Sequence, residues 1–382
     1  MDAPIDGTCD SRFAAVREAF ACNFVLHDEI GAAVTVSVGG RMVVDLWGGH
    51  ADVARRQPWR SDTLVNVFSL GKALTTLAAL TLVDQGRLDL DAPVARYWPV
   101  FAAGGKEAVT TRQLLCHRAG LPAIRAPLPA GAMLQWPTMT DALARETPWW
   151  TPGTRHGYHV NTFGFLVGEV VRRIAGRSLG TVLRDDIARP LDADVHIGLA
   201  ATDLARVAEW KWLEEVSNVP DSPALTDEHR MLRNTYFNPP GLSGHGVINT
   251  APWRRAEIPS TNGHGNARGV ARVFAALAAG GAIDGIRIVS SSALAEACTE
   301  HSSGPDAILG RATRFGLGFQ LPEVERPIGP NAGAFGHFGA GGSLGFADPA
   351  AGVAFGYVMN RMGPRWQSPT TRRLMDAVYA CV

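Results

Sequence analysis

The chain has 382 residues, of which 46% are hydrophobic and 19% charged, and its 36 basic residues balance its 36 acidic residues. This composition suits a globular enzyme with a large core. A neutral chain without a basic run argues against nucleic-acid binding, which depends on neutralising phosphates. No stretch approaches the roughly 20 apolar residues that span a bilayer, and the first residues lack the pattern of a secretory signal. We therefore expect a cytoplasmic protein with neither nucleic acid nor membrane as a partner.

Two residue types bear on the compartment and the chemistry. The five cysteines are scattered without Cys-x-x-Cys spacing, so we expect reduced thiols. Only three of the basic residues are lysines: Lys72, Lys106 and Lys211. Arginine keeps its proton in proteins, whereas a buried lysine can lose it. A lysine inside an apolar segment of this chain is therefore a candidate general base.

The first predicted elements are a hairpin and a buried helix. Over residues 32–48, β-branched residues alternate on both sides of Gly39-Gly40, which is typical of a two-residue hairpin turn. Residues 69–85 are apolar nearly all round, and such a helix is buried. Gly86 follows as a helix-ending residue.

The later elements are helices in the middle of the chain and strands near its end. The clearest helix of the middle region covers residues 163–176, whereas the Pro- and Asn-rich segment 217–262 is expected to be mostly irregular. Another helix covers 266–281, with its start capped by the preceding NGHGN stretch. The last third contains extended segments at 314–321 and at 334–360 with a turn at DPAAG, and a closing helix at 367–382.

This order predicts the fold class. Strands come first, then helices, then strands again, which indicates an α/β protein of the α+β type. We expect an antiparallel sheet built from both chain ends and flanked by helices, with a mostly helical region inserted. One catalytic domain would cover residues 12–380. Its α/β part would comprise 12–68 and 256–382, and its helical part 69–255.

The pentapeptide GGSLG at 341–345 fits Gly-x-Ser-x-Gly and nominates Ser343 as a nucleophile. That motif needs a strand, a tight turn and then a helix. Here a strand, a turn and another strand follow, and no histidine comes after His337, so the order of a catalytic triad cannot be completed. We therefore interpret the pentapeptide as a Gly-rich strand that permits close backbone approach.

Ser69-Leu70-Gly71-Lys72 offers a better nucleophile at the start of the buried helix. Residues three apart share a helix face, with Cβ atoms roughly 5–6 Å apart, so Lys72 can reach the Ser69 hydroxyl. Burial and the positive helix end both lower the pKa of Lys72, and a neutral amine can take the serine proton. The Ser69 amide points to where an oxyanion would form. The competing interpretation is a capping serine with a surface lysine, which the apolar surroundings of Lys72 argue against.

Tyr158 is a further candidate, because a tyrosine in a Pro-Gly loop ahead of a helix can lie beside a Ser-Lys pair. Its phenolate could act as base and its phenol as acid, although a loop tyrosine alone is usually packing. His156 and His159 bracket it, but without a fuller ligand set we expect no metal. We expect His159 to line the cleft or the surface, and His117 to be a structural hydrogen-bonding residue in a helix-to-loop turn.

Four segments follow one another in order and with wide spacing: FSLGK (68–72), TTRQLLCHRAGLP (110–122), TPGTRHGYHVNTFGFLVGEVV (151–171) and GHFGAGGSLGFADP (336–349). Together they resemble the serine β-lactamase-like superfamily, and within it the family VIII carboxylesterases, relatives of class C β-lactamases. The resemblance covers residues 12–380. It implies a fold like that of β-lactamases and penicillin-binding proteins, and a hydrolase that works through an acyl-enzyme without a cofactor.

The resemblance assigns roles residue by residue. Ser69 matches the acylated nucleophile, Lys72 its helix partner and Tyr158 the tyrosine of the second motif. The segment His337-Phe338-Gly339 lies where the lactamases have Lys-Thr-Gly. Ala340, which follows it, would supply the second oxyanion N–H beside that of Ser69.

The departures from the family pattern concern the substrate. Val160 stands where the lactamases have an asparagine, Asn161 is one residue away, and the cationic lysine of Lys-Thr-Gly is His337. A site without these contacts should prefer uncharged, short-acyl esters to penicillins. Val160, His337, Gly339 and Trp366 are the candidate substrate-binding residues, with Trp366 as a wall of an apolar acyl pocket. The alternatives are a β-lactamase or D-amino-acid peptidase, and a non-catalytic scaffold on the same fold. The oligomeric state is left open.

Overall fold

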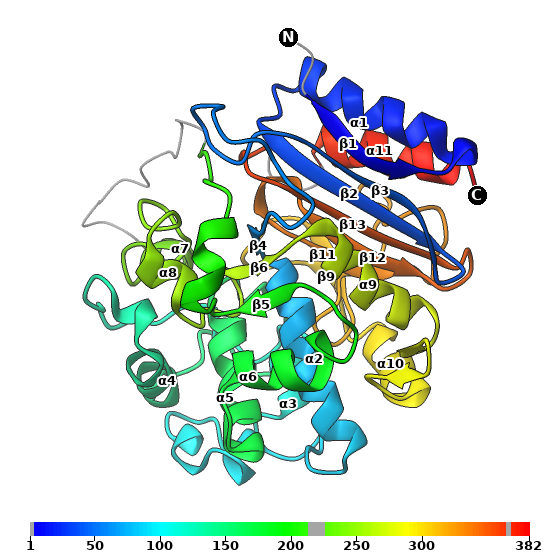
Figure 1. The fold of residues 1–382 in the computed structure, drawn as a ribbon. Helices are drawn as coiled ribbons and strands as arrows, with labels where there is room; N and C mark the ends of the chain where they lie inside the picture. Colours follow the sequence, from blue (N-terminus) through cyan, green and yellow to red (C-terminus); the bar gives the residue numbers. More distant parts are fainter. Residues whose placement is uncertain (1–3, 213–225, 364–367) are drawn as a thin grey trace.

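The computed structural model describes residues 4–212, 226–363 and 368–382 (Figure 1). Its main sheet has six strands in the order β1-β3-β2-β13-β12-β11, and neighbouring strands are antiparallel. Three strands come from the start of the chain and three from its end, so the predicted sheet built from both chain ends is confirmed. The strands are β1 (Ile5–Cys9), β2 (Gly31–Val38), β3 (Arg41–Gly49), β11 (Phe335–Phe338), β12 (Leu344–Asp348) and β13 (Val353–Met359).

Helices cover both faces of this sheet (Figure 1). Two successive residues of β12 face opposite sides of the sheet. A side chain on Gly345 would meet Phe274 of α9 (Ala267–Ala278), whereas Phe346 stacks on Tyr379 of α11 (Pro369–Tyr379). Beside α11 lies α1 (Ala14–Leu26), a helix that the sequence patterns did not indicate. The sheet is therefore buried on both sides, which explains why most of its residues are apolar.

The helical region is organised around α2 (Leu70–Asp84), every residue of which from Leu70 to Leu82 is buried. The predicted buried helix is thus confirmed. Helix α2 packs against α5 and α6. Among the described residues, no helix is long and apolar enough to cross a membrane. The other helices are α3 (Thr111–Leu115), α4 (Trp136–Arg145), α5 (Thr162–Ala175), α6 (Leu179–Leu183), α7 (Asp227–Phe237), α8 (Ala251–Arg255) and α10 (Ser291–Cys298).

The described residues also form three smaller sheets. In one of them, β4 (Val65–Phe68) pairs with β6 (Gly263–Gly265), which pairs with β5 (Val195–Ile197). A second is the hairpin of β9 (Ser302–Pro305) and β10 (Ala312–Phe315), and the third pairs β7 (Ala282–Ile283) with β8 (Ile286–Arg287). Because β4 runs directly into α2, it fixes where Ser69 emerges.

Several local predictions are confirmed. The two-residue turn between β2 and β3 has φ values of 57° at Gly39 and 81° at Gly40, as a primed hairpin turn requires. Gly176 ends α5 in the left-handed conformation. The side chain of Asn266 accepts the Gly269 N–H and so caps α9, and α11 lies inside the predicted closing helix.

Two predicted elements need correction, and a third needs an addition. The segment 217–262 is mostly irregular in its described part, 226–262, as expected, but it also contains two helices, α7 capped by Thr226 and α8 capped by Thr250. In 314–321 only the first two residues belong to a strand, since the chain turns at Gly318 with φ of 69° to pass α2. The run before DPAAG is two strands, β11 and β12, separated by a short 3-10 turn at Ala340–Gly342.

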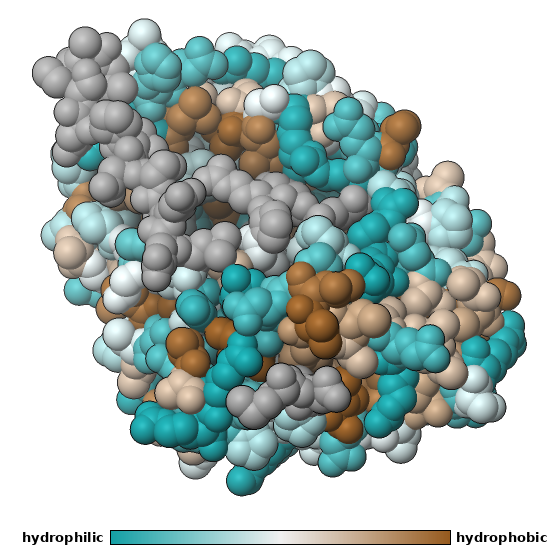
Figure 2. All heavy atoms as spheres, turned by 90° about the horizontal axis from the view of Figure 1, so that it is seen from above, coloured by the Kyte–Doolittle hydropathy of each residue, from teal (hydrophilic) through white to brown (hydrophobic). Residues whose placement is uncertain are grey.

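In the view of Figure 2, hydrophilic and hydrophobic residues intermix over the described part of the surface. Among the described residues, the large apolar side chains that are exposed are spread over several elements: Val25, Leu26, Met42, Val100, Leu134, Phe237, Val324 and Val382. Isolated apolar residues of this kind are normal on globular proteins.

Candidate active site

Ser69 stands at the junction of β4 and α2, where the backbone takes an unusual conformation. Phe68 has φ of 50°, in the left-handed region that a bulky residue rarely enters. Its ring is held by Trp210 and Trp212, with centroids 4.8 and 5.9 Å away. Along the chain, Ser69 therefore follows a strand and a sharp turn and stands directly before a buried helix.

Lys72 is completely buried and makes three polar contacts. Its Nζ lies 2.7 Å from the carbonyl oxygen of Val160, 3.1 Å from that of Ser260 and 3.2 Å from Ser69 Oγ. Burial lowers the pKa of Lys72 well below its ordinary value. A neutral amine has two N–H groups, which the two carbonyls can accept, and its lone pair then remains for the Ser69 hydroxyl proton.

Tyr158 closes this group from the other side. It is 1% exposed, and its hydroxyl shares a hydrogen bond with the Ser69 side chain. Its ring centroid lies 4.6 Å from Lys72 Nζ, and its Oη lies 3.4 Å from His337 Nε2. Burial raises the pKa of Tyr158 above its ordinary value, so the resting side chain is a neutral phenol.

His337 lies on β11 with its side chain toward Tyr158. Its Nδ1 is 2.7 Å from the carbonyl oxygen of Phe338, which can only accept, so Nδ1 carries the proton and Nε2 is the acceptor facing Tyr158. Burial, with the nearby Lys72 as a second cause, lowers the pKa of His337 to about 3. The His337 ring is fully buried and neutral. It is therefore better placed to hydrogen-bond with Tyr158 than to contact a substrate.

The turn at 339–343 packs against the strand that carries Ser69. A Cβ on Gly339 would lie 2.2 Å from the Val67 carbonyl oxygen, and the Gly339 N–H donates to the Ser343 carbonyl at 2.7 Å. The Ser343 hydroxyl donates to Val67 O at 3.1 Å. Ser343 therefore fastens this turn to β4, and the exposed Ala340 is the first residue of the 3-10 segment within the turn. The interpretation of GGSLG as part of a continuous strand is wrong, because Gly341 has φ of 87°.

The substrate-binding candidates in the second motif are placed as follows. Val160 offers its carbonyl to Lys72, and its side chain packs on the small apolar cluster around Trp150 and Ile308. The amide of Asn161 is fully engaged, donating to Thr235 O at 2.7 Å and accepting from the Thr261 hydroxyl at 2.6 Å. No amide group therefore replaces the missing asparagine at this position. Trp366 lies outside the described residues.

The histidines near Tyr158 are buried and structural. His117, which follows α3 with φ of 61°, accepts the His159 N–H at 3.2 Å, as expected for a turn histidine. The expectation that His159 lines the cleft or the surface is wrong: it is wholly buried beside Trp150 and accepts the Leu121 N–H at 2.9 Å. Within the ranges that the structure describes, no cluster of three His, Cys, Asp or Glu side chains could hold a metal.

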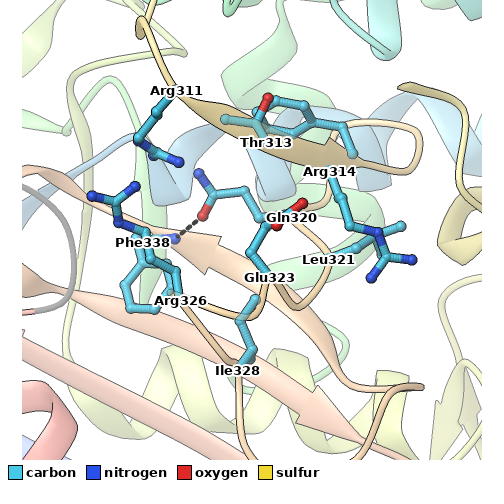
Figure 3. Close-up of a pocket in the computed structure, with 10 residues that line it drawn as sticks. Arg311, Thr313, Arg314, Gln320, Leu321, Glu323, Arg326, Ile328 and Phe338 are labelled. Atoms are coloured by element: carbon cyan, nitrogen blue, oxygen red, sulfur yellow. Dashed lines mark hydrogen bonds between the residues drawn. The ribbon is translucent and has the colours of Figure 1, made fainter. Parts of the chain in front are cut away.

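A small pocket with both apolar and charged lining residues adjoins Tyr158 (Figure 3). Its wall includes Phe315, whose ring stacks on Tyr158 with centroids 5.6 Å apart and planes 7° apart. Figure 3 shows the guanidinium groups of Arg311 and Arg326 gathered beside the amide of Gln320. The Gln320 amide oxygen accepts a main-chain N–H of β11 at 2.9 Å. Positive charge thus stands near the tyrosine although the Lys-Thr-Gly position holds a neutral histidine.

Two contributors to the site carry no motif. The carbonyl of Ser260 binds Lys72, and the Ser260 hydroxyl accepts the Gly164 N–H of α5 at 2.6 Å. Asp306 accepts the main-chain N–H of Tyr158. In the sequence, the contact of Ser260 with α5 is indicated only by the glycine at position 164. A Cβ there would lie 2.5 Å from the Ser260 nitrogen. Nothing near residue 306 indicates its contact.

Comparison with known proteins places this geometry in a family. The Beta-lactamase family model matches residues 18–380, nearly the entire chain. The chain belongs to the β-lactamase family. The resemblance based on four motif segments is therefore confirmed, and with it the predicted fold and the assignment as a serine hydrolase.

Individual members of this family are similar over almost their whole length. A family VIII carboxylesterase of known crystal structure has a TM-score of 0.92 and 41% identity, covering 99% of this chain and 100% of that one. A penicillin-binding protein homologue from Caulobacter crescentus has a TM-score of 0.90 and 40% identity, with the same coverage. The esterase/β-lactamase LipL of Mycobacterium tuberculosis is 38% identical over 368 residues, covering 93% of this chain and 83% of LipL.

Proposed function

We propose that this β-lactamase-family protein is a carboxylesterase that hydrolyses small, short-acyl esters through an acyl-enzyme on Ser69. The observation that carries the proposal is the surroundings of Lys72. Lys72 Nζ lies 2.7 and 3.1 Å from the carbonyl oxygens of Val160 and Ser260 and 3.2 Å from Ser69 Oγ. When the amine is neutral, the two carbonyls accept its N–H groups and its lone pair can take the Ser69 proton, which activates the serine.

In the first half-reaction, Ser69 Oγ attacks the ester carbonyl carbon while its proton passes to Lys72 Nζ. The oxyanion of the tetrahedral intermediate is held by the main-chain N–H groups of Ser69 and Ala340. The bond to the leaving alcohol then breaks, and Tyr158 gives its phenolic proton to the departing oxygen. The ammonium of Lys72 restores that proton, so the acyl-enzyme forms with both side chains neutral.

In the second half-reaction, water takes the place of the alcohol. Its proton passes to the Tyr158 and Lys72 pair as its oxygen attacks the acyl carbon, and the pair returns a proton to Ser69 Oγ as the acid leaves. Because burial raises the pKa of Tyr158 and lowers that of Lys72, we assign the first proton transfer to Lys72 and the acid role to Tyr158. His337 Nδ1–H donates to the Phe338 carbonyl oxygen, so its Nε2 can accept a hydrogen bond from the Tyr158 phenol and hold it in place.

The preference for esters rests on what the site lacks and on its relatives. Val160 and the neutral His337 stand where lactamases have an amide and a cation, and Asn161 is engaged elsewhere. The family VIII carboxylesterase supports ester hydrolysis. The name of LipL and the penicillin-binding homologue support β-lactam hydrolysis as the second candidate. Initial rates on p-nitrophenyl butyrate and nitrocefin compare the two directly, and we expect the butyrate to be far the better substrate.

The decisive experiment is labelling by a fluorophosphonate, followed by mass mapping of the adduct. We expect a single adduct on Ser69, which Ser69→Ala abolishes together with ester hydrolysis. Ser343→Ala is the matched control, since it removes only a hydrogen bond to Val67 and should retain activity within a few-fold. Labelling of Ser69→Ala at wild-type rate, or loss of activity in a folded Ser343→Ala variant, would refute the assignment.

A further inference from the structure

We propose that Asp306 is a positioning residue for Tyr158, an inference that rests on the proposed function. Asp306 lies between β9 and β10, and its side chain is completely buried. Its Oδ1 and Oδ2 accept the Tyr158 main-chain N–H at 3.0 and 3.1 Å, across 148 residues of sequence. The carboxylate therefore grips the backbone of the residue that we assign as the acid.

The other contacts of this carboxylate are donors as well. Oδ1 accepts the N–H groups of Ile308 and Leu309 at 2.9 Å each, and Oδ2 accepts the Thr313 hydroxyl at 3.2 Å. Carboxylate oxygens are hydrogen-bond acceptors, and each of these partners is an N–H or O–H donor. Hydrogen bonds to a carboxylate are among the stronger ones in a protein interior.

The same hairpin holds the tyrosine loop at further points. Since the Thr313 hydroxyl donates to Asp306, its oxygen accepts from His156 Nε2, which lies 2.8 Å away. The Ala307 N–H donates to the His156 carbonyl at 3.1 Å. On the strand that follows, Phe315 stacks on the Tyr158 ring. One short hairpin thus contacts the loop before the tyrosine, its main-chain nitrogen and its ring.

The geometry makes the consequence for catalysis specific. The hydroxyl of Tyr158 must reach both Ser69 and His337, while its backbone is fixed at Asp306. A shift of about 1 Å in a catalytic group can lower a rate by about 100-fold. Asp306 touches no reacting atom, so any effect on the reaction passes through the tyrosine.

The first test compares Asp306→Ala with Asp306→Asn on p-nitrophenyl butyrate. Alanine removes every hydrogen bond that the Asp306 carboxylate accepts. We expect kcat to fall about 10- to 100-fold, with KM changed less than about threefold. Asparagine retains the acceptor toward Tyr158, and its amide can donate to Thr313 if that hydroxyl turns toward His156. We therefore expect Asp306→Asn to recover most of kcat. An alanine variant within twofold of wild type would overturn the proposal.

The second test separates positioning from general stability. In a Tyr158→Phe background, Asp306→Ala should lower the residual kcat by less than about twofold, because residues that act as a unit are not additive. The matched control is Asp348→Ala, which removes another buried carboxylate, one that accepts the Tyr379 hydroxyl at 2.7 Å. It should lower Tm while leaving kcat unchanged. An equal loss from Asp306→Ala in both backgrounds would overturn the proposal.

Two further results bear on the proposal: failure of Asp306→Ala to fold, and a wild-type kcat in Tyr158→Phe. If Asp306→Ala does not fold, Thr313→Val replaces it, since this change removes only the hydroxyl between Asp306 and His156. We expect a smaller loss of kcat that again vanishes with Tyr158→Phe, and an additive loss would overturn the proposal. If Tyr158→Phe keeps wild-type kcat, positioning is refuted, whereas the proposed esterase still stands or falls on the labelling of Ser69.

Discussion

At the residue scale, the site depends on side chains that burial keeps neutral. Lys72, Tyr158 and His337 would all be expensive to charge where they lie, and each contacts the next. The unusual feature is His337 in place of a lysine. A second ammonium beside Lys72 would further disfavour protonation there, whereas a neutral acceptor leaves Lys72 free to take up the proton of Ser69.

The first prediction concerns the pH dependence of the reaction. Lys72 must be neutral to act, and its pKa lies well below 10.5, so the active fraction rises as pH rises through that lowered value. We expect kcat/KM for p-nitrophenyl butyrate to reach its plateau far below pH 10.5. A profile that continues to rise toward pH 10.5 would show an ordinary lysine and contradict the proposed base.

The second prediction is that Lys72→Met abolishes turnover while Ser69 remains in place. The methionine is close in volume and cannot accept a proton, so we expect kcat to fall at least about 1000-fold, near the upper range for loss of a general base. Fluorophosphonate labelling at Ser69 should slow in parallel. Near-normal labelling by a folded variant would mean that another group activates the serine.

At the element scale, the turn between β11 and β12 matters because it is pressed against β4. Gly339 has φ of −98°, which suits any residue, so only the nearby Val67 carbonyl and Ser343 hydroxyl demand glycine there. In the proposed mechanism, this contact positions the Ala340 amide as the second oxyanion donor beside Ser69, so the proposed oxyanion site depends on the packing of two elements.

The third prediction follows from that contact. Gly339→Ala should push the turn away from β4 and lower kcat about 10- to 100-fold, because one oxyanion donor is displaced. Gly333→Ala is the control, since Gly333 lies just before β11 and a Cβ there meets nothing within 4 Å. Steady-state kinetics on both variants, with Tm as a check of folding, decide the matter. Equal kcat values for the two would show that the turn does not hold the oxyanion donor.

At the scale of the whole molecule, buried neutral histidines make stability depend on pH. Burial lowers the pKa of His159 to about 4 and those of His264 and His337 to about 3, and it lowers that of His117 well below 6.5. The unfolded chain binds these protons near pH 6.5, so it binds more protons than the folded chain below that value. Their contribution is complete above pH 6.5 and is lost as pH falls toward 3. Glu29, with its pKa raised to about 8 by burial, acts in the opposite direction but is a single group.

The fourth prediction is therefore a fall in the free energy of unfolding between pH 7 and pH 5, measured by urea titration. His264→Gln should flatten this dependence, because the variant has one fewer group to protonate on unfolding. His229→Gln is the control, since His229 is exposed on α7 and should leave the slope unchanged. A slope that is the same in wild type and His264→Gln would contradict this account.

The parts of the fold that the sequence predicted are those with a local pattern. The hairpin at Gly39-Gly40, the apolar helix α2 and the cap at Asn266 each follow from a few neighbouring residues. The Ser69 and Lys72 pair could be found for the same reason, because the helix itself sets the spacing. Family resemblance was needed to add Tyr158 and Ala340.

The parts that escaped prediction depend on contacts between distant segments. Asp306 meets Tyr158 across 148 residues, and no periodicity records such a pair. His159 is in the loop between α4 and α5, and its burial depends on His117, which follows α3, as well as on Trp150 of its own loop. The break between β11 and β12 was missed because its glycines look alike in a strand and a turn, and only the packing on β4 distinguishes them.

In the proposed mechanism, the enclosure of Lys72 also determines when Ser69 becomes reactive during synthesis of the chain. On a ribosome, α2 emerges long before Val160, Ser260 and β11 exist to surround it, and an exposed lysine is charged at neutral pH. The nascent Ser69 therefore lacks a base until distant segments have been made and packed. Esters and other acylating compounds would not modify the chain while it is incomplete, and reactivity toward them reports that folding has finished.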